Sequence, residues 1–223
     1  MRNTAQGKEV LEKYLPLQSF PAIFPLLEKY NVRINIAGGR ITKFGDFNSS
    51  PRKGNIPEIS INGNLNSFFF LITLLHELAH FLVWNEGHFH AKPHGRLWKL
   101  HFVCLMNEMI SLNIFPDELL GSLKKHLENP KATSCSDFVL FKKLSQYDYE
   151  KQGIYIDDLP DNTMFETVNG DIFKKIRKIK TRSLCKQIHS GKKYLFSPVY
   201  RVFPVKDKQY IIVFSLIFIY LPD

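Results

Sequence analysis

The chain has 223 residues, of which 44% are hydrophobic and 23% charged; these values exclude a disordered chain and suit one core, or one core with a small appendage. Its cysteines, Cys104, Cys135 and Cys185, are widely spaced and contain no C-x-x-C pair, so a disulfide framework is excluded and a reducing cytoplasm is the expected compartment. The N-terminus has no apolar h-region, so we expect no secretion signal. The net charge of +9 is uneven, because residues 171–208 carry a charge of about +10.

The first part of the chain predicts two short helices followed by a small sheet. Residues 8–15 have amphipathic spacing, and residues 19–30 begin with a Ser that can cap a helix and a Pro for its first turn. Alternating residues predict strands at 31–37 and 40–47, joined as a hairpin by a glycine pair, and a third strand at 58–62. We expect a small antiparallel sheet that packs on the helix that follows.

The third strand has two possible roles, to which the sequence gives equal weight. An edge strand can bind an extended peptide by strand addition, and residues 57–62 lie just before the most informative stretch of the chain. The same residues would also suit a strand that only builds the sheet.

The centre of the chain is a long apolar run that contains two histidines and a glutamate. From Phe68 to Trp84 it is almost all apolar and lacks Pro and Gly, and Asn64 and Asn66 stand where an N-cap belongs. We therefore expect a buried helix. Polar groups inside such a helix cost free energy unless they have partners, and a bound cation would be a partner.

The polar residues of this helix form an H-E-x-x-H motif, His76-Glu77-Leu78-Ala79-His80. One helical turn separates His76 from His80, so both imidazoles share a face and can reach one metal ion. Glu77 is placed to act as a general base on a water at that ion. A chance motif on a solvent-exposed face is the alternative, which the apolar flanks disfavour.

A catalytic zinc site needs a third protein ligand and an open fourth position. The metzincin pattern is excluded, because Val83 and Glu86 stand where it needs Gly and His. His94 is the strongest candidate, since Pro93 and Gly95 suit a tight turn that would direct its imidazole back to the first helix.

Other possible donors near the motif are given other roles. His88 and His90 lie in a polar loop and are expected to be solvated, and Glu108 is kept as a reserve ligand. His101 is interpreted as a packed or surface residue, and Cys104 as a buried core residue. The second long helix is expected at residues 95–112, with an apolar stripe made of Leu97, Leu100, His101, Cys104 and Leu105.

The last third of the chain changes from helical to strand-like spacing. Helices are expected at 116–128 and 137–146, followed by a polar, acidic linker at 147–162. Short alternating segments from residue 164 onward, separated by Gly-containing turns, predict a β-unit of four or five strands. The apolar tail at 210–221 is shorter than the ~20 residues of a membrane helix and is interpreted as a buried strand.

This β-unit carries most of the positive charge, and its Lys and Arg residues alternate with aromatic residues. The pattern suits phosphate contacts with base stacking, and a merely solvated strand face is the equal alternative. The candidate nucleic-acid contacts are Lys174, Lys175, Arg177, Lys178, Lys180 and Arg182.

The segment HELAH, followed by a loop and then PHGRLWK, resembles the SprT-like family of zinc metallopeptidases, which includes bacterial SprT and eukaryotic Spartan. The resemblance covers roughly residues 15–205 and implies a zincin-like helical core that binds one zinc ion per chain. It also implies protein substrates, which Spartan-like members cleave on DNA or crosslinked to it. The residues that carry over are the ligands His76, His80 and His94, the base Glu77 and the packing aromatic Trp98.

Many members of that family have a C-terminal zinc ribbon held by two cysteine pairs, and this chain retains only Cys185 there. We therefore expect a metal-free sheet in its place. The expected fold class is α+β, with a SprT-like metallopeptidase domain at 1–150 and a basic C-terminal β-unit at 163–223.

The expected function is zinc-dependent hydrolysis of peptide bonds, with the β-unit bringing the catalytic part to DNA or to proteins on it. One alternative is a nucleic-acid-associated binding protein with a structural or vestigial zinc site, which would have no need of Glu77. Another is metal-assisted hydrolysis of a different bond, because the same ligands serve several electrophiles. No membrane span is expected.

Overall fold

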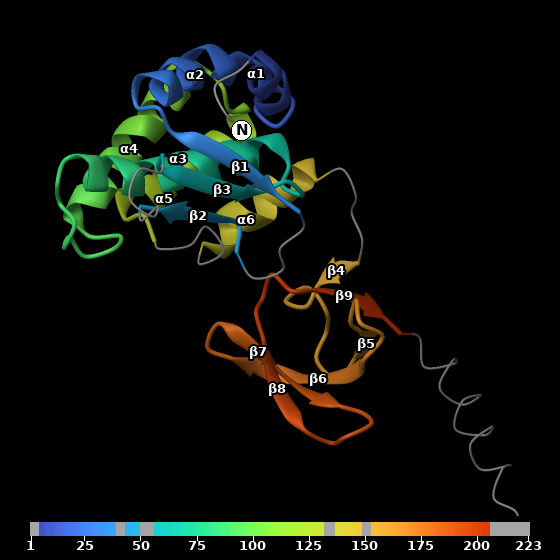
Figure 1. The fold of residues 1–223 in the computed structure, drawn as a ribbon. Helices are drawn as coiled ribbons and strands as arrows, with labels where there is room; N and C mark the ends of the chain where they lie inside the picture. Colours follow the sequence, from blue (N-terminus) through green and yellow to red (C-terminus); the bar gives the residue numbers. More distant parts are fainter. Residues whose placement is uncertain (1–4, 39–42, 50–55, 132–136, 149–152, 206–223) are drawn as a thin grey trace, which may run out of the picture. The chain divides into compact units, whose positions relative to one another are not determined.

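The protein is an α+β structure, which the computed structural model describes for residues 5–38, 43–49, 56–131, 137–148 and 153–205. The chain divides into two compact units, residues 1–149 and 150–223 (Figure 1). Each unit has its own cluster of buried hydrophobic residues.

The first unit combines six helices with a three-stranded sheet in its described part. The helices are α1 (Ala5–Glu12), α2 (Phe20–Lys29), α3 (Ser67–Asn85), α4 (Arg96–Ser111), α5 (Asp117–Glu128) and α6 (Phe138–Leu144), with 3-10 turns at η1 (Leu17–Ser19) and η3 (Ser145–Tyr147). The strands are β1 (Arg33–Ala37), β2 (Gly45–Asn48) and β3 (Glu58–Asn62).

The sheet is mixed, and the expected antiparallel hairpin between its first two strands is wrong. Its order is β1-β3-β2, with β1 parallel and β2 antiparallel to β3. Ile59 and Ile61 of β3 are fully buried, and the central position gives both a neighbour on each side. Because β3 is central, residues 57–62 do not supply an open edge for a peptide.

Helix α3 forms where the apolar run predicts it, and both of its ends have identifiable caps. The Asn66 side chain accepts a hydrogen bond from the Phe69 amide at 3.0 Å, which confirms the expected N-cap. At the other end Gly87 has φ +84°, and His88 N donates to Val83 O at 3.2 Å. This is the Schellman arrangement, in which a left-handed glycine satisfies the last carbonyls of a helix.

Helix α3 is the centre of the first unit. It packs across β2 and β3 and against α4 (Figure 1), and twelve of its 19 residues are buried. Its length and apolar composition alone would also suit a membrane span. The burial of most of the helix among the other elements of its unit accounts for the same composition.

The predicted apolar stripe of helix α4 is confirmed only in part, because Leu105 is buried and Leu97 partly buried while other members face solvent. The residues that enter the core are Trp98, Phe102, Leu105, Met106 and Met109. Leu100 is 64% exposed, and Cys104 is exposed rather than buried as expected. The stacked rings of Trp98 and Phe102, with centroids 5.0 Å apart, direct the larger apolar residues inward.

The second unit is an antiparallel sheet of six strands in the order β4-β9-β5-β6-β7-β8. Its core contains Phe165, Phe173 and Cys185. The tail at 210–221 lies outside the described residues. The strands are β4 (Ile154–Tyr155), β5 (Met164–Glu166), β6 (Ile172–Ile179), β7 (Arg182–Gln187), β8 (Lys193–Phe196) and β9 (Arg201–Pro204).

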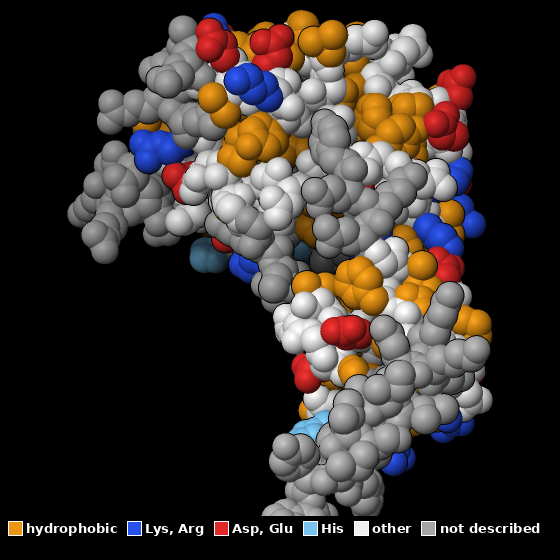
Figure 2. Space-filling view, turned by 90° about the vertical axis from the view of Figure 1, so that its right-hand side faces the viewer, with side chains coloured by type: hydrophobic (Ala, Val, Ile, Leu, Met, Phe, Trp, Pro, Cys, Tyr) orange, Lys and Arg blue, Asp and Glu red, His pale blue; other side chains and the backbone are white. Residues whose placement is uncertain are grey.

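The molecular surface in Figure 2 gives no single dominant feature. On this face, hydrophobic and charged side chains lie in separate small groups among uncharged atoms. Helix α3, by contrast, buries two polar residues, Thr73 and Glu77.

Candidate metal centre

Three imidazoles meet at one point between α3 and the turn before α4. His94 Nε2 lies 3.1 Å from His76 Nε2 and 3.0 Å from His80 Nε2. The candidate donor atoms of these three residues all lie within 4.8 Å of one another. His76 and His80 share a face of the helix, as the H-E-x-x-H spacing predicts, and the structure brings His94 to them from outside the helix.

The position of His94 depends on an unusual backbone conformation. His94 has φ +55°, in the left-handed region that non-glycine residues rarely adopt. The turn is closed by a hydrogen bond of 2.9 Å from Gly95 N to Lys92 O. A Cβ on Gly95 would lie 2.7 Å from that same carbonyl oxygen, so the turn requires glycine there. Such conformations persist where the surrounding contacts fix them, and they are common at functional sites.

Trp98 forms the floor of the histidine cluster. Its indole Nε1 donates to the His76 carbonyl oxygen at 3.1 Å. Its ring centroid lies 4.6 Å from that of His76, 5.5 Å from that of His80 and 4.8 Å from that of His94. Because Trp98 is 1% exposed and stacked on Phe102, it restricts the rotation of all three imidazoles.

The electrostatics of the cluster keep the imidazoles neutral. Burial lowers the pKa of His76 to about 3, with additional effects from His80 and His94. Burial and then His94 lower the pKa of His80 to about 4, and burial also lowers the pKa of His94. Neutral imidazoles have a free nitrogen lone pair, which is the form that binds a metal ion.

The group of His76, His80 and His94 can therefore hold a metal ion. Without a cation, His94 Nε2 is within hydrogen-bond distance of two other ring nitrogens. A neutral imidazole nitrogen is either a donor or an acceptor, so it satisfies both neighbours only in particular tautomers. A shared cation is compatible with three lone pairs directed to one point, and the donor set fits a metal centre.

Glu77 lies beside the histidines and is almost fully buried, with 7% of its surface exposed. Burial, and after it the charge of the nearby Asp46, raise the pKa of its carboxyl to about 7. A backbone hydrogen bond from Phe47 and the charge of Lys43 act in the opposite direction. The carboxyl can therefore take up and release a proton near neutral pH.

Gly45 of β2 allows the sheet to approach this carboxyl closely. A Cβ at position 45 would lie 2.8 Å from Glu77 Oε1 and 2.7 Å from Thr73 Cγ2. No larger residue fits there unless α3 or β2 shifts. This contact was not predicted, because Gly45 lies 32 positions before Glu77 and its neighbours have the pattern of an ordinary strand.

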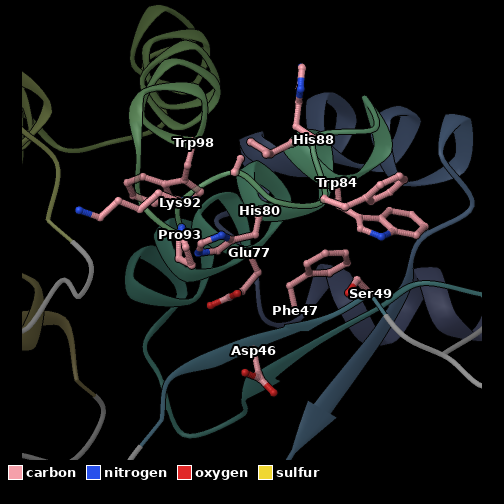
Figure 3. Close-up of a pocket in the computed structure, with 13 residues that line it drawn as sticks. Asp46, Phe47, Ser49, Glu77, His80, Trp84, His88, Lys92, Pro93 and Trp98 are labelled. Carbon is pink, nitrogen blue, oxygen red and sulfur yellow. The ribbon is translucent and has the colours of Figure 1, made fainter.

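A pocket of about 420 Å³ opens beside Glu77 and His80 (Figure 3). Its lining includes Phe47 of β2, Trp84 of α3 and Phe89 of the following loop. These aromatic residues were not recognised as site residues from the sequence, since each also suits a core position.

The remaining donors considered from the sequence lie outside the cluster. His88 lines the pocket and His90 is exposed, but neither belongs to a metal-binding group among the described residues. Glu108 is also exposed and outside the group, so the structure offers no reason to keep it as a reserve ligand. His101 Nε2 lies 3.0 Å from Glu86 Oε2, which is within hydrogen-bond distance.

The six basic residues proposed for nucleic-acid contact do not form one set. Lys174, Arg177, Lys180 and Arg182 are exposed, and Lys178 is exposed but pairs with Asp157 at 2.7 Å. Lys175 is 4% exposed and donates to the carbonyl oxygens of Ile156 and Leu159 at 2.9 and 2.6 Å, so its proposed contact role is wrong. The bulge between Lys175 and Arg177 interrupts the alternation that the prediction assumed.

The sheet register aligns three lysines in one row across the sheet. Of these, only Lys174 was a candidate contact from the sequence, and the row itself was not predicted. Lys174 of β6 lies opposite Lys186 of β7, which lies opposite Lys193 of β8. All three are exposed. Like charges directly opposite one another on a sheet are unfavourable, and a bound polyanion would relieve this repulsion.

No family model, curated protein or solved structure matches the chain. The class of site is therefore defined by its own geometry, which is a three-histidine group with an adjacent buried carboxyl.

The metal centre predicts that removing His94 abolishes stable metal binding. Protein purified without added metal should contain about one ion per chain, and His94→Ala should lose it on dialysis because two imidazoles remain. His90→Ala is the matched control, since His90 is exposed and outside the cluster. The measurement is metal content by mass spectrometry, and full retention in His94→Ala would remove His94 from the ligand set.

The close contact at position 45 predicts that Gly45→Ala destabilises the first unit. Overpacking against Thr73 and Glu77 should lower the free energy of unfolding by about 1–3 kcal/mol, measured by denaturant unfolding. Gly121→Ala is the control, because a Cβ at this position in α5 would meet nothing within 4 Å. This control should leave stability equal or raise it by up to about 1 kcal/mol. Equal effects of the two substitutions would contradict the contact.

Proposed function

We propose that this chain is a zinc-dependent peptidase of the SprT-like type, with a zincin-like core in its first unit. The observation that carries the proposal is the convergence of three neutral imidazoles beside a buried carboxyl whose pKa is about 7. Nitrogens that share a tetrahedral zinc at about 2.0–2.1 Å lie about 3.3 Å apart. The spacings of 3.0 and 3.1 Å around His94 are close to that value.

In this proposal each residue has a separate role. His76, His80 and His94 would hold the ion. Zinc, when bound, would acidify a water and polarise the carbonyl of a peptide bond. The Glu77 carboxylate accepts a proton from the attacking water and passes it to the nitrogen of the leaving amine. A structural metal site would have no need of a buried carboxyl beside its ligands, and this favours catalysis.

The free edge of β2 is suited to hold the substrate backbone. Asn62 N donates to Phe44 O at 2.8 Å, so with the observed register the backbone groups of residues 46 and 48 face β3. Those of Gly45 and Phe47 face the other way, where no strand pairs with β2 among the described residues and where the Phe47 amide donates to the Glu77 carboxyl. An extended peptide added at this edge would lie beside Glu77. Residues 45–47 are therefore proposed to pair with the substrate backbone, in place of residues 57–62.

The second unit is proposed to bring the peptidase to nucleic acid, and DNA-associated proteins are the proposed substrates. The row of Lys174, Lys186 and Lys193 supports this, together with the exposed Arg177 and Arg182. The cysteine usage is consistent with a cytoplasmic protein.

The lysine row also supports the second candidate function, a nucleic-acid-associated binding protein whose metal site is structural or vestigial. The two candidates share the second unit and differ in Glu77. A substitution of that residue therefore separates them.

The peptidase proposal predicts that Glu77→Gln keeps the metal ion and loses cleavage. Loss of the base should reduce kcat/KM by about 10²- to 10⁴-fold, measured with a fluorescein-labelled basic protein free and bound to plasmid DNA. Glu86→Gln is the matched control, because Glu86 follows the same helix and pairs with His101 away from the cluster. Unchanged cleavage in Glu77→Gln would contradict the base assignment. Absence of cleavage in the wild-type protein would favour the binding protein.

The nucleic-acid proposal predicts that the double substitution Lys174→Glu and Lys186→Glu weakens DNA binding. Binding of a labelled single-stranded oligonucleotide should become weaker and less salt-dependent, with the slope of log K against log salt reduced by about 1 or more. Lys13→Glu with Lys124→Glu is the control of equal charge, at exposed positions in the first unit. An equal loss in both double variants would indicate an effect of net charge alone.

A further inference from the structure

The pocket beside the histidine cluster has one wall of aromatic rings. The Phe47 and Trp84 rings pack edge to face with centroids 6.0 Å apart, and Trp84 and Phe89 do the same at 6.1 Å. Phe47 is anchored from below by an edge-to-face contact with Phe81 at 5.8 Å. The wall is therefore a preformed apolar surface rather than a set of unrelated side chains.

This aromatic wall is incompletely covered. Phe89 is 66% exposed, and Phe47 and Trp84 are only half-buried. In Figure 3 the Trp84 and Phe47 rings border the opening next to Glu77, while the Lys92 side chain points away from them. Covering contiguous apolar surface in a concave site is energetically favourable. Contact with the wall would therefore stabilise a bound apolar group.

The identity of the occupant follows from what surrounds the wall. Phe47 belongs both to the wall and to the free edge of β2, and Glu77 borders the same pocket. A peptide extended along that edge alternates its side chains between the two faces. A side chain on the face of α3 would enter the pocket while its backbone lies next to Glu77.

The charges at the pocket disfavour an acidic occupant. Asp46 and Glu77 both line it, and Asp46 is paired with Lys43 at 3.0 Å. A carboxylate at the wall would meet the Glu77 carboxyl, while Lys92, which also lines the pocket, points away from the wall. The volume of about 420 Å³ has room for a large side chain.

We propose that Phe47, Trp84 and Phe89 form a specificity pocket that accepts a large apolar or aromatic side chain of an extended peptide next to the bond that is cleaved. The proposal rests on the proposed peptidase function. It assigns these three residues to substrate selection and leaves the proton transfer to Glu77.

The test uses peptides that are identical except for one side chain, which is Phe, Leu, Ala, Lys or Asp. The varied residue is placed in turn at every position within three residues of the cleaved bond. Where no cleavage occurs, it is placed in turn at every position of the peptide. Binding is measured by calorimetry on zinc-loaded Glu77→Gln, and cleavage is measured on zinc-loaded wild-type protein. At one position Phe and Leu should exceed Ala by at least about 10-fold in binding and in kcat/KM, and Asp should be the poorest.

Substitutions in the wall should remove this preference. Trp84→Ala should reduce the Phe-to-Ala ratio toward 1, and Phe89→Ala should reduce it several-fold without threatening the fold, because Phe89 is 66% exposed. Leu100→Ala is the matched control, since Leu100 is 64% exposed on α4 and does not line the pocket. It should leave the ratio unchanged.

The outcomes separate this proposal from the peptidase function. Selective binding without cleavage would support the pocket and contradict the peptidase. Cleavage with equal rates across the series, or with a preference for Lys or Asp, would overturn the pocket alone. A Phe-to-Ala ratio that survives both wall substitutions would also overturn it, as would the absence of any peptide binding.

Discussion

The candidate metal centre depends on the convergence of His76, His80 and His94. Two of these residues are fixed by one turn of a buried helix, and the third is fixed by a left-handed turn closed by Gly95. Trp98 then holds the three rings from one side. Burying three imidazoles so close together lowers their pKa values, and a shared cation would compensate for that cost.

The carboxyl beside this group links the helix to the sheet. Glu77 is buried against β2, where Gly45 permits the close approach and Phe47 provides a backbone hydrogen bond. The same strand supplies the edge at which a peptide can pair and one ring of the aromatic wall. Binding of a substrate backbone, selection of its side chain and transfer of a proton would therefore all depend on four residues of one short strand.

Sequence analysis succeeded where the determinants are local. The apolar run, the Asn66 cap and the one-turn spacing of His76 and His80 all act within a few residues of one another. It failed where distant elements decide: β3 lies between β1 and β2, and Gly45 meets a residue 32 positions later. The buried face of α4 likewise depends on the stacked rings of Trp98 and Phe102. Lys175 is buried because it lies on the same face of β6 as Phe173, where the carbonyl oxygens of Ile156 and Leu159 accept its hydrogen bonds.

The central proposal is that His76, His80 and His94 would together hold a single zinc ion. X-ray absorption at the zinc edge of the purified protein tests this most directly, because it reports the number and kind of atoms around the metal. The account predicts four light-atom neighbours at about 2.0–2.1 Å with the outer-shell pattern of three imidazoles. A shell of two imidazoles, a sulfur neighbour at about 2.3 Å or six oxygen-type ligands would contradict it.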